Sequence, residues 1–408
     1  MLYSKLIGKT KKQFPKDEES LNAQLLIKAG FIQKEMAGVY IFLPLGLRVL
    51  NKIINIVKEE MNSIGGQEIL LSALQNPEVW KKSGRWNDEI LDVWFKTQLK
   101  NGSEIGLGTT HEEPLANLLS ERIQSYKDLP LYIYQFQTKF RNETRARSGL
   151  IRTREFIMKD LYSFNKTNEE LDKFYEKAKE AYIKIFERIG IGDKTFLTFA
   201  GGGSFSKYSH EFQTVCTAGE DTIYLDRNKK IAINKEVYFD EVIKDLGLKK
   251  EELEEVNAVE VGNIFKQGTR FSEPLGLKFT DKNGVEKPVV MGAYGIAPSR
   301  SMATVVETNH DDKGIIWPKS ISPYQAHLVA LNINANSVYK KLNSTGVEVL
   351  FDDRENVTAG EKLSDADLIG IPNRLIASKN TGDKVELKSR NSDEKKILSV
   401  EELLNFLS

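Results

Sequence analysis

Cysteine and histidine are scarce in this chain of 408 residues. The single cysteine, Cys216, excludes an intramolecular disulfide and a zinc site built from thiolates. The four histidines, residues 111, 210, 310 and 327, lie far apart in the sequence, which argues against a histidine-rich metal site. No run of about 18 apolar residues is present, and the first residues lack the apolar core of a secretion signal. We therefore expect a cytoplasmic protein without a membrane segment.

Net charge is also absent, because 58 basic and 58 acidic residues cancel. Overall charge therefore does not attract this chain to nucleic acid, although a local basic surface is still compatible with the composition. The common nucleotide signatures GxxxxGK[ST] and GxGxxG after a strand are missing, as is the metalloprotease signature HExxH. Apolar residues make up 40% and charged residues 28%, which is typical of a globular protein. The length indicates two or three domains.

Long helices alternate with strands in the first 199 residues. Apolar residues at helical spacing predict a helix that begins after Pro44 and ends at Gly65. Residues 131–138 read as a strand, residues 150–158 as a weaker one, and the polar loop between them suggests an antiparallel pair. A second amphipathic helix is predicted over residues 169–189.

The rest of the chain changes character twice. Residues 213–258 are more charged and less regular, and the charged run at 249–255 is typical of a solvated helix face. After Pro318 strands and helices alternate, which predicts a small α/β domain with a largely parallel sheet. The expected strands are 325–333, 347–352 and 374–378, and the expected helices lie near 336–342, 361–369 and after Ser399.

A basic segment covers residues 139–160. It carries seven positive residues against three negative ones, a net charge of 7 − 3 = +4 within a neutral protein. Guanidinium groups on a strand–loop–strand suit the phosphates of a nucleotide or of RNA. A surface hairpin with incidental arginines is the alternative, and charge alone does not decide between them. The positive residues are Lys139, Arg141, Arg145, Arg147, Arg152, Arg154 and Lys159, and the negative residues are Glu143, Glu155 and Asp160.

Two other segments carry informative polar residues. In residues 106–113, Thr110 and Glu112 share one side if the chain is extended, and a hydroxyl beside a carboxylate can receive an ammonium group. The alternative is a helix cap, because Thr110 and Glu113 also have the spacing of a capping box. Residues 292–300 read as a strand, a glycine turn and a helix start that carries Arg300.

In their order, these segments resemble the signature motifs of class II aminoacyl-tRNA synthetases, and specifically bacterial-type prolyl-tRNA synthetases. The three motifs correspond to GVYIFLPLG (38–46), FRNETRARSGLIRTREFIMKDLYSF (140–164) and GAYGIAPSR (292–300). Residues 110–112 match the TxE loop, and residues 352–372 resemble the class IIa anticodon-binding domain. The resemblance implies an α+β catalytic domain with an antiparallel sheet flanked by helices, plus a C-terminal α/β anticodon-binding domain.

The resemblance also implies where the domains lie. Residues 1–212 and 259–318 would form the two parts of the catalytic domain, and residues 323–408 the anticodon-binding domain. Between the catalytic parts, residues 213–258 would be a short connection in place of the large editing insertion that many bacterial members carry. We therefore expect no cis-editing of alanyl-tRNA, and activation of alanine beside proline.

In this family the enzyme activates L-proline with ATP and Mg²⁺ to prolyl-adenylate and then transfers it to the 3′ end of tRNA(Pro). Arg141 would bridge the α-phosphate and the proline carboxylate, and Arg300 would hold the far end of the triphosphate; these two are the expected catalytic residues. The ligands of Mg²⁺ are not assigned. A homodimer formed through the first motif is expected. The implied ATP-binding residues are Arg141, Glu143, Arg152, Phe156 and Arg300, and the implied proline-binding residues are Thr110, Glu112, Arg141 and His210.

Contacts with tRNA are expected at its acceptor end and at its anticodon. Arg145 would touch the acceptor end, or be a solvent-facing arginine. Residues 323–408 hold 11 basic and 13 acidic residues, so recognition of the anticodon would depend on a few placed groups. The candidates are Arg354, Glu355, Lys362 and Asp365.

The sequence departs from the family pattern at Ala293, where cysteine is usual, and at Ala297, where glycine is usual. Two other classes of function are open. A synthetase for threonine or glycine would share the fold, although threonyl enzymes need zinc ligands that this chain can hardly supply. A synthetase-like accessory protein would bind tRNA without activating an amino acid, but such proteins are expected to lose the motif residues Arg141, Glu143 and Arg300.

Overall fold

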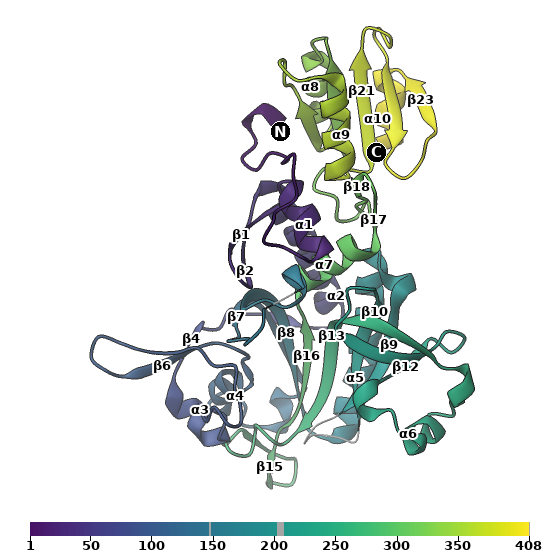
Figure 1. Ribbon diagram of the computed structural model, residues 1–408. Coiled ribbons are helices and arrows are strands. Elements are labelled where there is room, and N and C mark those ends of the chain that lie inside the picture. The colour runs from purple at the N-terminus through teal and green to yellow at the C-terminus, as the bar shows by residue number, and fades with distance from the viewer. Residues whose placement is uncertain (147, 202–207, 408) are drawn as a thin grey trace.

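The computed structural model describes residues 1–146, 148–201 and 208–407. A large lower part holds the long central strands, and a smaller upper part holds the C-terminal residues (Figure 1). The expected α+β core with a separate C-terminal α/β domain is confirmed. None of the helices in the described residues is long and apolar enough to cross a membrane.

Nine strands of the described residues form the central sheet of the large part, in the order β10-β9-β12-β11-β13-β16-β8-β7-β3. Neighbouring strands are antiparallel except for the parallel pairs β3–β7 and β12–β9. The strands are β3 (Gln67–Glu68), β7 (Leu131–Phe140), β8 (Glu155–Asn165), β9 (Thr195–Gly201), β10 (Tyr208–Val215), β11 (Asp221–Asp226), β12 (Ile231–Asn234), β13 (Glu254–Gly268) and β16 (Val290–Ile296).

Helices α2 (Pro44–Ser63) and α5 (Asn168–Arg188) follow the predicted bounds closely. Pro44 occupies the first turn of α2, where its missing N–H costs nothing. The hydroxyl of Thr167 accepts a hydrogen bond from the Glu170 backbone at 3.3 Å, which caps α5. Both helices bury one apolar stripe in the main core, together with α1 (Leu21–Lys28) and α7 (Pro298–Thr308).

The second strand of the basic segment begins later than its sequence indicates. Residues 150–158 were the expected strand, but Gly149–Ile151 form a short 3-10 helix and β8 starts at Glu155. Ser148 and Gly149 have φ angles of 61° and 63°, which turn the chain before the strand. Leu150 and Ile151 are apolar because this turn is buried against α7 and α1, not because it is a strand. The antiparallel pair of β7 and β8 is confirmed.

Residues 213–258 are more regular than predicted. They contribute β11, β12 and the short helix α6 (Asp240–Asp245). The long strand β13 pairs with β11 through its first residues and with β10 through later ones, while β9 pairs with both β10 and β12. Five strands therefore close into a ring of pairings with a small apolar core of its own, which holds Phe196 and Ile223.

The C-terminal domain has a five-stranded sheet in the order β20-β19-β21-β22-β23. The first three strands are parallel, as predicted, and β22 and β23 add antiparallel neighbours. Its strands are β19 (Ala326–Leu331), β20 (Val349–Asp352), β21 (Asn373–Ser378), β22 (Val385–Ser389) and β23 (Lys395–Leu398), and its helices are α8 (Asn336–Ser344), α9 (Ala359–Ile369) and α10 (Val400–Leu407).

Smaller elements surround the two sheets. They are β1 (Ile32–Met36), β2 (Val39–Phe42), β4 (Leu74–Gln75), α3 (Pro77–Ser83), β5 (Lys96–Gln98), β6 (Glu104–Leu107), α4 (Glu112–Ser120), β14 (Lys278–Thr280), β15 (Glu286–Pro288), β17 (His310–Asp311) and β18 (Gly314–Ile315). In Figure 1, α3, α4 and β6 lie beside one end of the central sheet, and β9 and β12 form its other end.

Candidate active site

Glu112 is a buried carboxylate with a nearly complete set of partners. The Thr110 hydroxyl donates to its Oε2 atom, and Gln267 Nε2 donates to Oε1 at 3.1 Å. Arg85 Nη1 lies 3.5 Å from Oε2. Burial raises the pKa of Glu112, but the charge of Arg85 and the hydrogen bond from Thr110 outweigh it and hold the pKa below its usual value. This group is therefore an anion at neutral pH.

The geometry around Glu112 differs from both expectations for this segment. Glu112 is the first residue of α4, so the segment is not extended through it. The expected capping box is also not formed, because His111 is the N-cap residue and the Thr110 hydroxyl bonds to Glu112 instead of the Glu113 backbone. The pairing of Thr110 with Glu112 is thus present, on a helix start.

A network of buried polar residues contacts the start of α4. Lys139 Nζ forms an ion pair with Asp160 at 2.9 Å and contacts the His111 ring. The Tyr162 hydroxyl donates to Asp160 at 3.0 Å and accepts a hydrogen bond from the His111 backbone at 3.1 Å. Burial and the charge of Lys139 lower the pKa of His111 to about 4, so its ring is neutral. The network holds the backbone at Thr110 and His111 in place.

A cavity of about 200 Å³ lies between the basic segment and β13, and the residues Arg141, Glu143, Arg152 and Arg300 line it together with Glu260. Burial and the charge of Arg300 both lower the pKa of Arg141, so the two guanidinium groups lie close enough to repel. An adjoining hollow is lined by Arg141, Arg300 and Phe156, with Arg141 5.4 Å from the Phe156 ring. The five expected ATP-binding residues therefore lie around one place.

Ion pairs and backbone contacts hold the arginines of this cavity. Arg300 Nε donates to the Ile151 carbonyl at 2.9 Å, and its Nη1 atom donates to the Glu260 carbonyl at 2.9 Å. Arg152 Nε donates to Glu143 at 2.9 Å. Arg300 begins in α7 and reaches the turn before β8, so two distant segments of the sequence meet here.

His210 lies on a different face of the sheet from the carboxylates beside it. Its Nδ1 atom is 2.8 Å from the Tyr175 hydroxyl on α5, and its ring meets Phe199 edge to face. Phe212 also packs against α5, whereas Glu211, between them, points to the other face and accepts a hydrogen bond from Gln213. The His210 ring thus faces the helix layer, and its expected contact with proline stays a prediction.

Four residues of this region were not among the sequence predictions. Arg85 and Gln267 contact Glu112, and Glu211 and Glu260 face the arginine cavity side of the sheet. Burial and the charge of Glu260 raise the pKa of Glu211 to about 8. No alternation along residues 259–267 could have indicated Glu260 or Gln267, because the polar residues there are 260, 263, 266 and 267.

The two departures from the family pattern both fall on buried positions. Ala293 on β16 packs in the same apolar cluster as Tyr162, beside the network under Glu112. Ala297 lines the hollow that also contains Phe156 and Arg300. Both small side chains therefore touch the surroundings of the candidate site.

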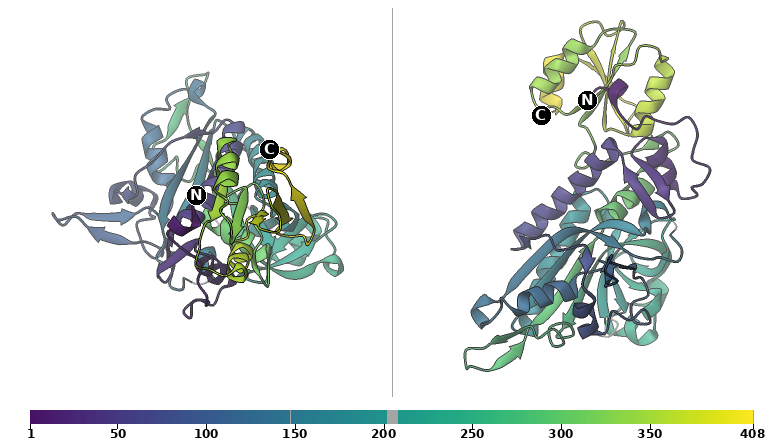
Figure 2. Two further views of the ribbon diagram at one scale, coloured as in Figure 1. Left: turned by 90° about the horizontal axis from the view of Figure 1, so that it is seen from above. Right: turned by 90° about the vertical axis from the view of Figure 1, so that its left-hand side faces the viewer.

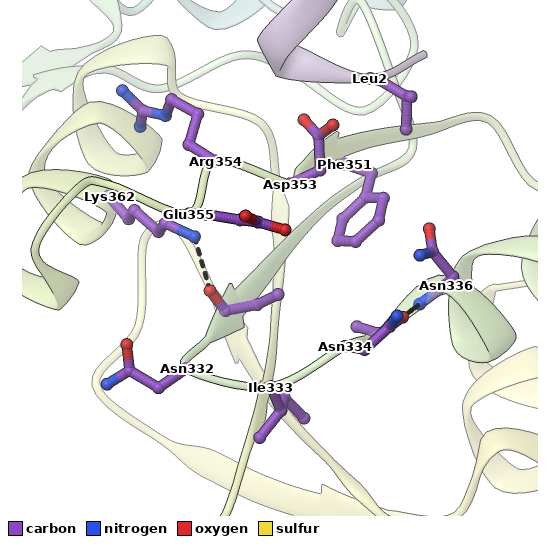
Figure 3. A pocket seen from close by; sticks show the side chains of 12 residues that line it. Leu2, Asn332, Ile333, Asn334, Asn336, Phe351, Asp353, Arg354, Glu355 and Lys362 are labelled. Atoms are coloured by element: carbon purple, nitrogen blue, oxygen red, sulfur yellow. Dashed lines mark hydrogen bonds between the residues drawn. The ribbon is translucent and has the colours of Figure 1, made fainter.

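The expected tRNA contacts are not all at the surface, because Lys362 is buried and only 13% of the Arg354 side chain is exposed. Arg145 is exposed in the loop before β8, and Arg147 lies outside the described residues. In the C-terminal domain, Arg354, Glu355 and Lys362 surround one cavity of about 540 Å³ (Figure 3). Asp365 is bonded to Arg354 Nη2 at 2.8 Å.

Comparison with known proteins defines the class. Residues 95–309 match the family described as "tRNA synthetase class II core domain (G, H, P, S and T)", and residues 321–408 match the family described as "Anticodon binding domain". The fold is similar to that of a prolyl-tRNA synthetase from Cryptosporidium parvum complexed with halofuginone and AMPPNP. That structure has a TM-score of 0.77 at 18% identity and covers 95% of this chain and 74% of the other. This is a class II tRNA synthetase fold.

Curated relatives narrow the class further. The chain is 34% identical to the proline–tRNA ligase of Dehalococcoides mccartyi strain 195, over 99% of this chain and 98% of the relative. It is 36% identical to the proline–tRNA ligase of Rickettsia akari over the full length of both. The chain belongs to the proline–tRNA ligase family. The first alignment extends over 559 positions and the second over 431, so this chain is a short form without the large insertion.

Proposed function

We propose that this enzyme activates L-proline with ATP to prolyl-adenylate and transfers the prolyl group to the 3′ end of tRNA(Pro). The observation that carries the proposal is the convergence of Arg141 and Arg300 on one cavity. The two cations repel each other, Glu260 and Glu143 offset this repulsion only in part, and an anion that enters between the cations would relieve it. A bent triphosphate supplies that anion, and planar guanidinium groups contact its oxygens in pairs.

Each expected residue has a role that its surroundings support. Arg141 would hold the α-phosphate and the proline carboxylate as negative charge accumulates on the phosphorus. Glu143 would accept a hydrogen bond from the adenine amino group, and Phe156 would stack on the ring. Arg300 would hold the far end of the triphosphate, and Arg152 would fix Glu143 through the ion pair between them. Little covalent work falls to the protein, so positioning dominates.

Proline carries a secondary ammonium with two N–H donors. Thr110 and the anionic Glu112 would accept them, because Glu112 keeps its charge although it is buried. Arg85 and Gln267 hold the carboxylate in one orientation. His210 enters the proposal as a residue that supports this sheet through Tyr175.

Mg²⁺ would be held by Glu211 and Glu260 together with phosphate oxygens of ATP. Within the described ranges, no three His, Cys, Asp or Glu side chains are arranged to hold a metal ion by themselves. This suits Mg²⁺, which commonly takes one or two carboxylates and completes its shell with phosphates and water. The raised pKa of Glu211 reflects burial and the nearby charge of Glu260, and a cation would relieve that repulsion. The metal neutralises phosphate charge when bound.

The partners follow from the same assignment. Arg145 would contact the acceptor end of tRNA, and the cavity around Arg354, Glu355 and Lys362 would receive anticodon bases, with Asp365 holding Arg354. A homodimer would form through the first motif, where Met36, Ile41 and Leu47 are apolar side chains with 60%, 45% and 45% of their surface exposed. Leu47→Glu should give monomers in sedimentation analysis, and a wild-type monomer would contradict the dimer.

Amino-acid-dependent ATP–pyrophosphate exchange tests the activity. Proline should support exchange far better than threonine or glycine. Arg141→Ala should abolish it with the circular dichroism spectrum unchanged, whereas Arg122→Ala should have no effect, because Arg122 is an exposed arginine in the turn after α4. A wild-type chain that binds tRNA but exchanges with no amino acid would favour the accessory-protein function instead.

A further inference from the structure

The first residues of the chain lie against the C-terminal domain, although most of the sequence separates them from it (Figures 1 and 2). The Phe351 backbone N–H donates to the Met1 carbonyl at 2.9 Å, and Leu2 forms a parallel bridge with Phe351 on the edge strand β20. The backbone and hydroxyl of Ser4 donate to the Asp353 carboxylate at 2.9 and 2.6 Å. This segment therefore extends the wall of the C-terminal sheet.

The same segment is anchored to the catalytic core a few residues later. Gly8 has a φ angle of 85°, and a Cβ atom there would lie 2.9 Å from the Gly30 carbonyl and 2.8 Å from Leu43. The Lys11 backbone donates to the Lys28 carbonyl at 2.8 Å. Residues 2–10, which we call the N-terminal strap, thus join the two domains across a short, fixed span.

Tyr3 lies near the start of the strap and is fully buried. The Arg354 guanidinium lies 4.3 Å from its ring centroid. The Tyr3 hydroxyl accepts from the Thr10 backbone at 3.1 Å, and the Thr10 hydroxyl donates to Asp365 Oδ1 at 2.7 Å. Asp365 Oδ2 in turn accepts from Arg354 at 2.8 Å, which closes a circuit of contacts around the arginine.

Arg354 is thereby held as a fixed wall of the cavity of about 540 Å³. Its guanidinium makes a two-pronged ion pair with Asp352, at 2.9 and 2.6 Å, and its side chain is only 13% exposed. The Leu2 side chain and Asp353, both set by the strap, line the same cavity (Figure 3). Phe351 and the amides of Asn332 and Asn334 give the other walls an apolar face and hydrogen-bonding edges, which suit an unpaired nucleobase.

We infer that the N-terminal strap shapes the cavity that takes an anticodon base, and that Tyr3 is a positioning residue for tRNA binding which acts through Arg354. The inference rests on the proposed function, because it takes the RNA partner from it. The strap sets affinity for tRNA and leaves the activation of proline unchanged, since Tyr3 contacts Arg354 of the C-terminal domain and does not line the arginine cavity.

Steady-state aminoacylation with full-length tRNA(Pro) tests the inference. Tyr3→Leu should raise the KM for tRNA at least 10-fold and change kcat, and ATP–pyrophosphate exchange with proline, less than twofold. Tyr3→Phe keeps the ring under Arg354 and should restore most of the affinity, to within about threefold of wild type. Ile7→Ala is the matched control, because Ile7 belongs to the strap but is 69% exposed, and it should have no effect.

A second substrate separates recognition from general destabilisation. On a tRNA(Pro) transcript with all three anticodon bases replaced, the wild type and Tyr3→Leu should have the same KM. If Tyr3→Leu does not fold, Ser4→Ala removes the hydroxyl bond to Asp353 and keeps the backbone one, and it should show the same split with a smaller rise in KM. An equal loss on both transcripts, or a loss of exchange, would overturn the inference. Absence of exchange in the wild type would instead overturn the proposed function.

Discussion

Glu112 and Glu113 are adjacent carboxyl groups with opposite pKa shifts. Arg85 contacts both, and the pKa of Glu112 lies below its usual value although burial opposes the shift. Burial and the neighbouring charge of Glu112 raise the pKa of Glu113 to about 7, despite Arg85. Because Thr110 and Gln267 donate to Glu112 alone, the negative charge is concentrated on that residue at neutral pH.

Glu112→Gln should therefore raise the KM for proline about 10- to 100-fold, because a hydrogen bond to a charged group contributes about 1.5–3 kcal/mol. The KM for ATP should change little. Pyrophosphate exchange at varied proline concentration measures the first value, and exchange at varied ATP concentration measures the second. Glu121→Gln, an exposed glutamate just after α4, serves as the control. An unchanged KM for proline would show that Glu112 does not receive the ammonium group.

Glu211 makes stability depend on pH. Its folded pKa is raised to about 8 from the usual 4.5, by burial and by Glu260, so the folded chain keeps a proton that the unfolded chain has lost. Stability should fall as pH rises from about 4.5 to about 8, by at most about 1.4 kcal/mol per pH unit. Urea unfolding of wild type and Glu211→Gln between pH 5 and 8.5 measures this. The stability of Glu211→Gln should not decline with pH in this way. Parallel curves of stability against pH for the two proteins would contradict the raised pKa of Glu211.

The side chains predicted from sequence and those missed differ in one physical respect. Arg141, Glu143 and Arg152 lie within one short segment whose charge pattern is visible. Arg85 and Gln267 are polar residues in ordinary surroundings, and the bond from Gln267 to Glu112 spans 155 positions of the chain. Such a contact depends on how β13 is placed against α4, which no local pattern encodes.

Secondary structure elements were predictable where one face is buried at a regular period. Helices α2 and α5 satisfy that condition, and their predicted ends differ from the structure by a residue or two. Residues 213–258 do not, because β11 and β12 are buried only through pairing with β13 and β9. Their charged neighbours indicated an irregular connection, while long-range hydrogen bonding makes them strands.

Helix α2 should be sensitive to a single methyl group. A Cβ atom on Gly46 would lie 2.1 Å from the Phe31 carbonyl oxygen, so the backbone has to shift, and Gly46→Ala should lower the unfolding free energy by about 2–3 kcal/mol. Gly360→Ala in α9 meets nothing within 4 Å and should raise it by up to about 1 kcal/mol. Chemical denaturation measures both. Equal changes in unfolding free energy for the two variants would show that the contact with Phe31 does not determine the cost of the substitution.

At the scale of the whole molecule, the short form has a consequence for accuracy. A pocket that accepts proline cannot exclude the smaller alanine by size, and each missing methylene changes binding by only about 1–3 kcal/mol. Alanine should therefore support measurable pyrophosphate exchange. Alanyl-tRNA(Pro) should persist when incubated with the purified enzyme, as followed by release of labelled alanine. Rapid deacylation would reveal a hydrolytic site in this chain.

The catalytic sheet should tolerate an insertion within its closed ring of strands, which is formed by β13, β10, β9, β12 and β11. Residues 227–230 turn back between β11 and β12, with their side chains in solvent. Because the cost of closing a loop grows only slowly with its length, a guest domain grafted at this turn would leave the neighbouring pairings intact. The turn is thus a suitable insertion site for a reporter or a foreign hydrolase domain. Such a fusion would carry the new activity beside prolyl-tRNA synthesis and would leave the arginine cavity unchanged.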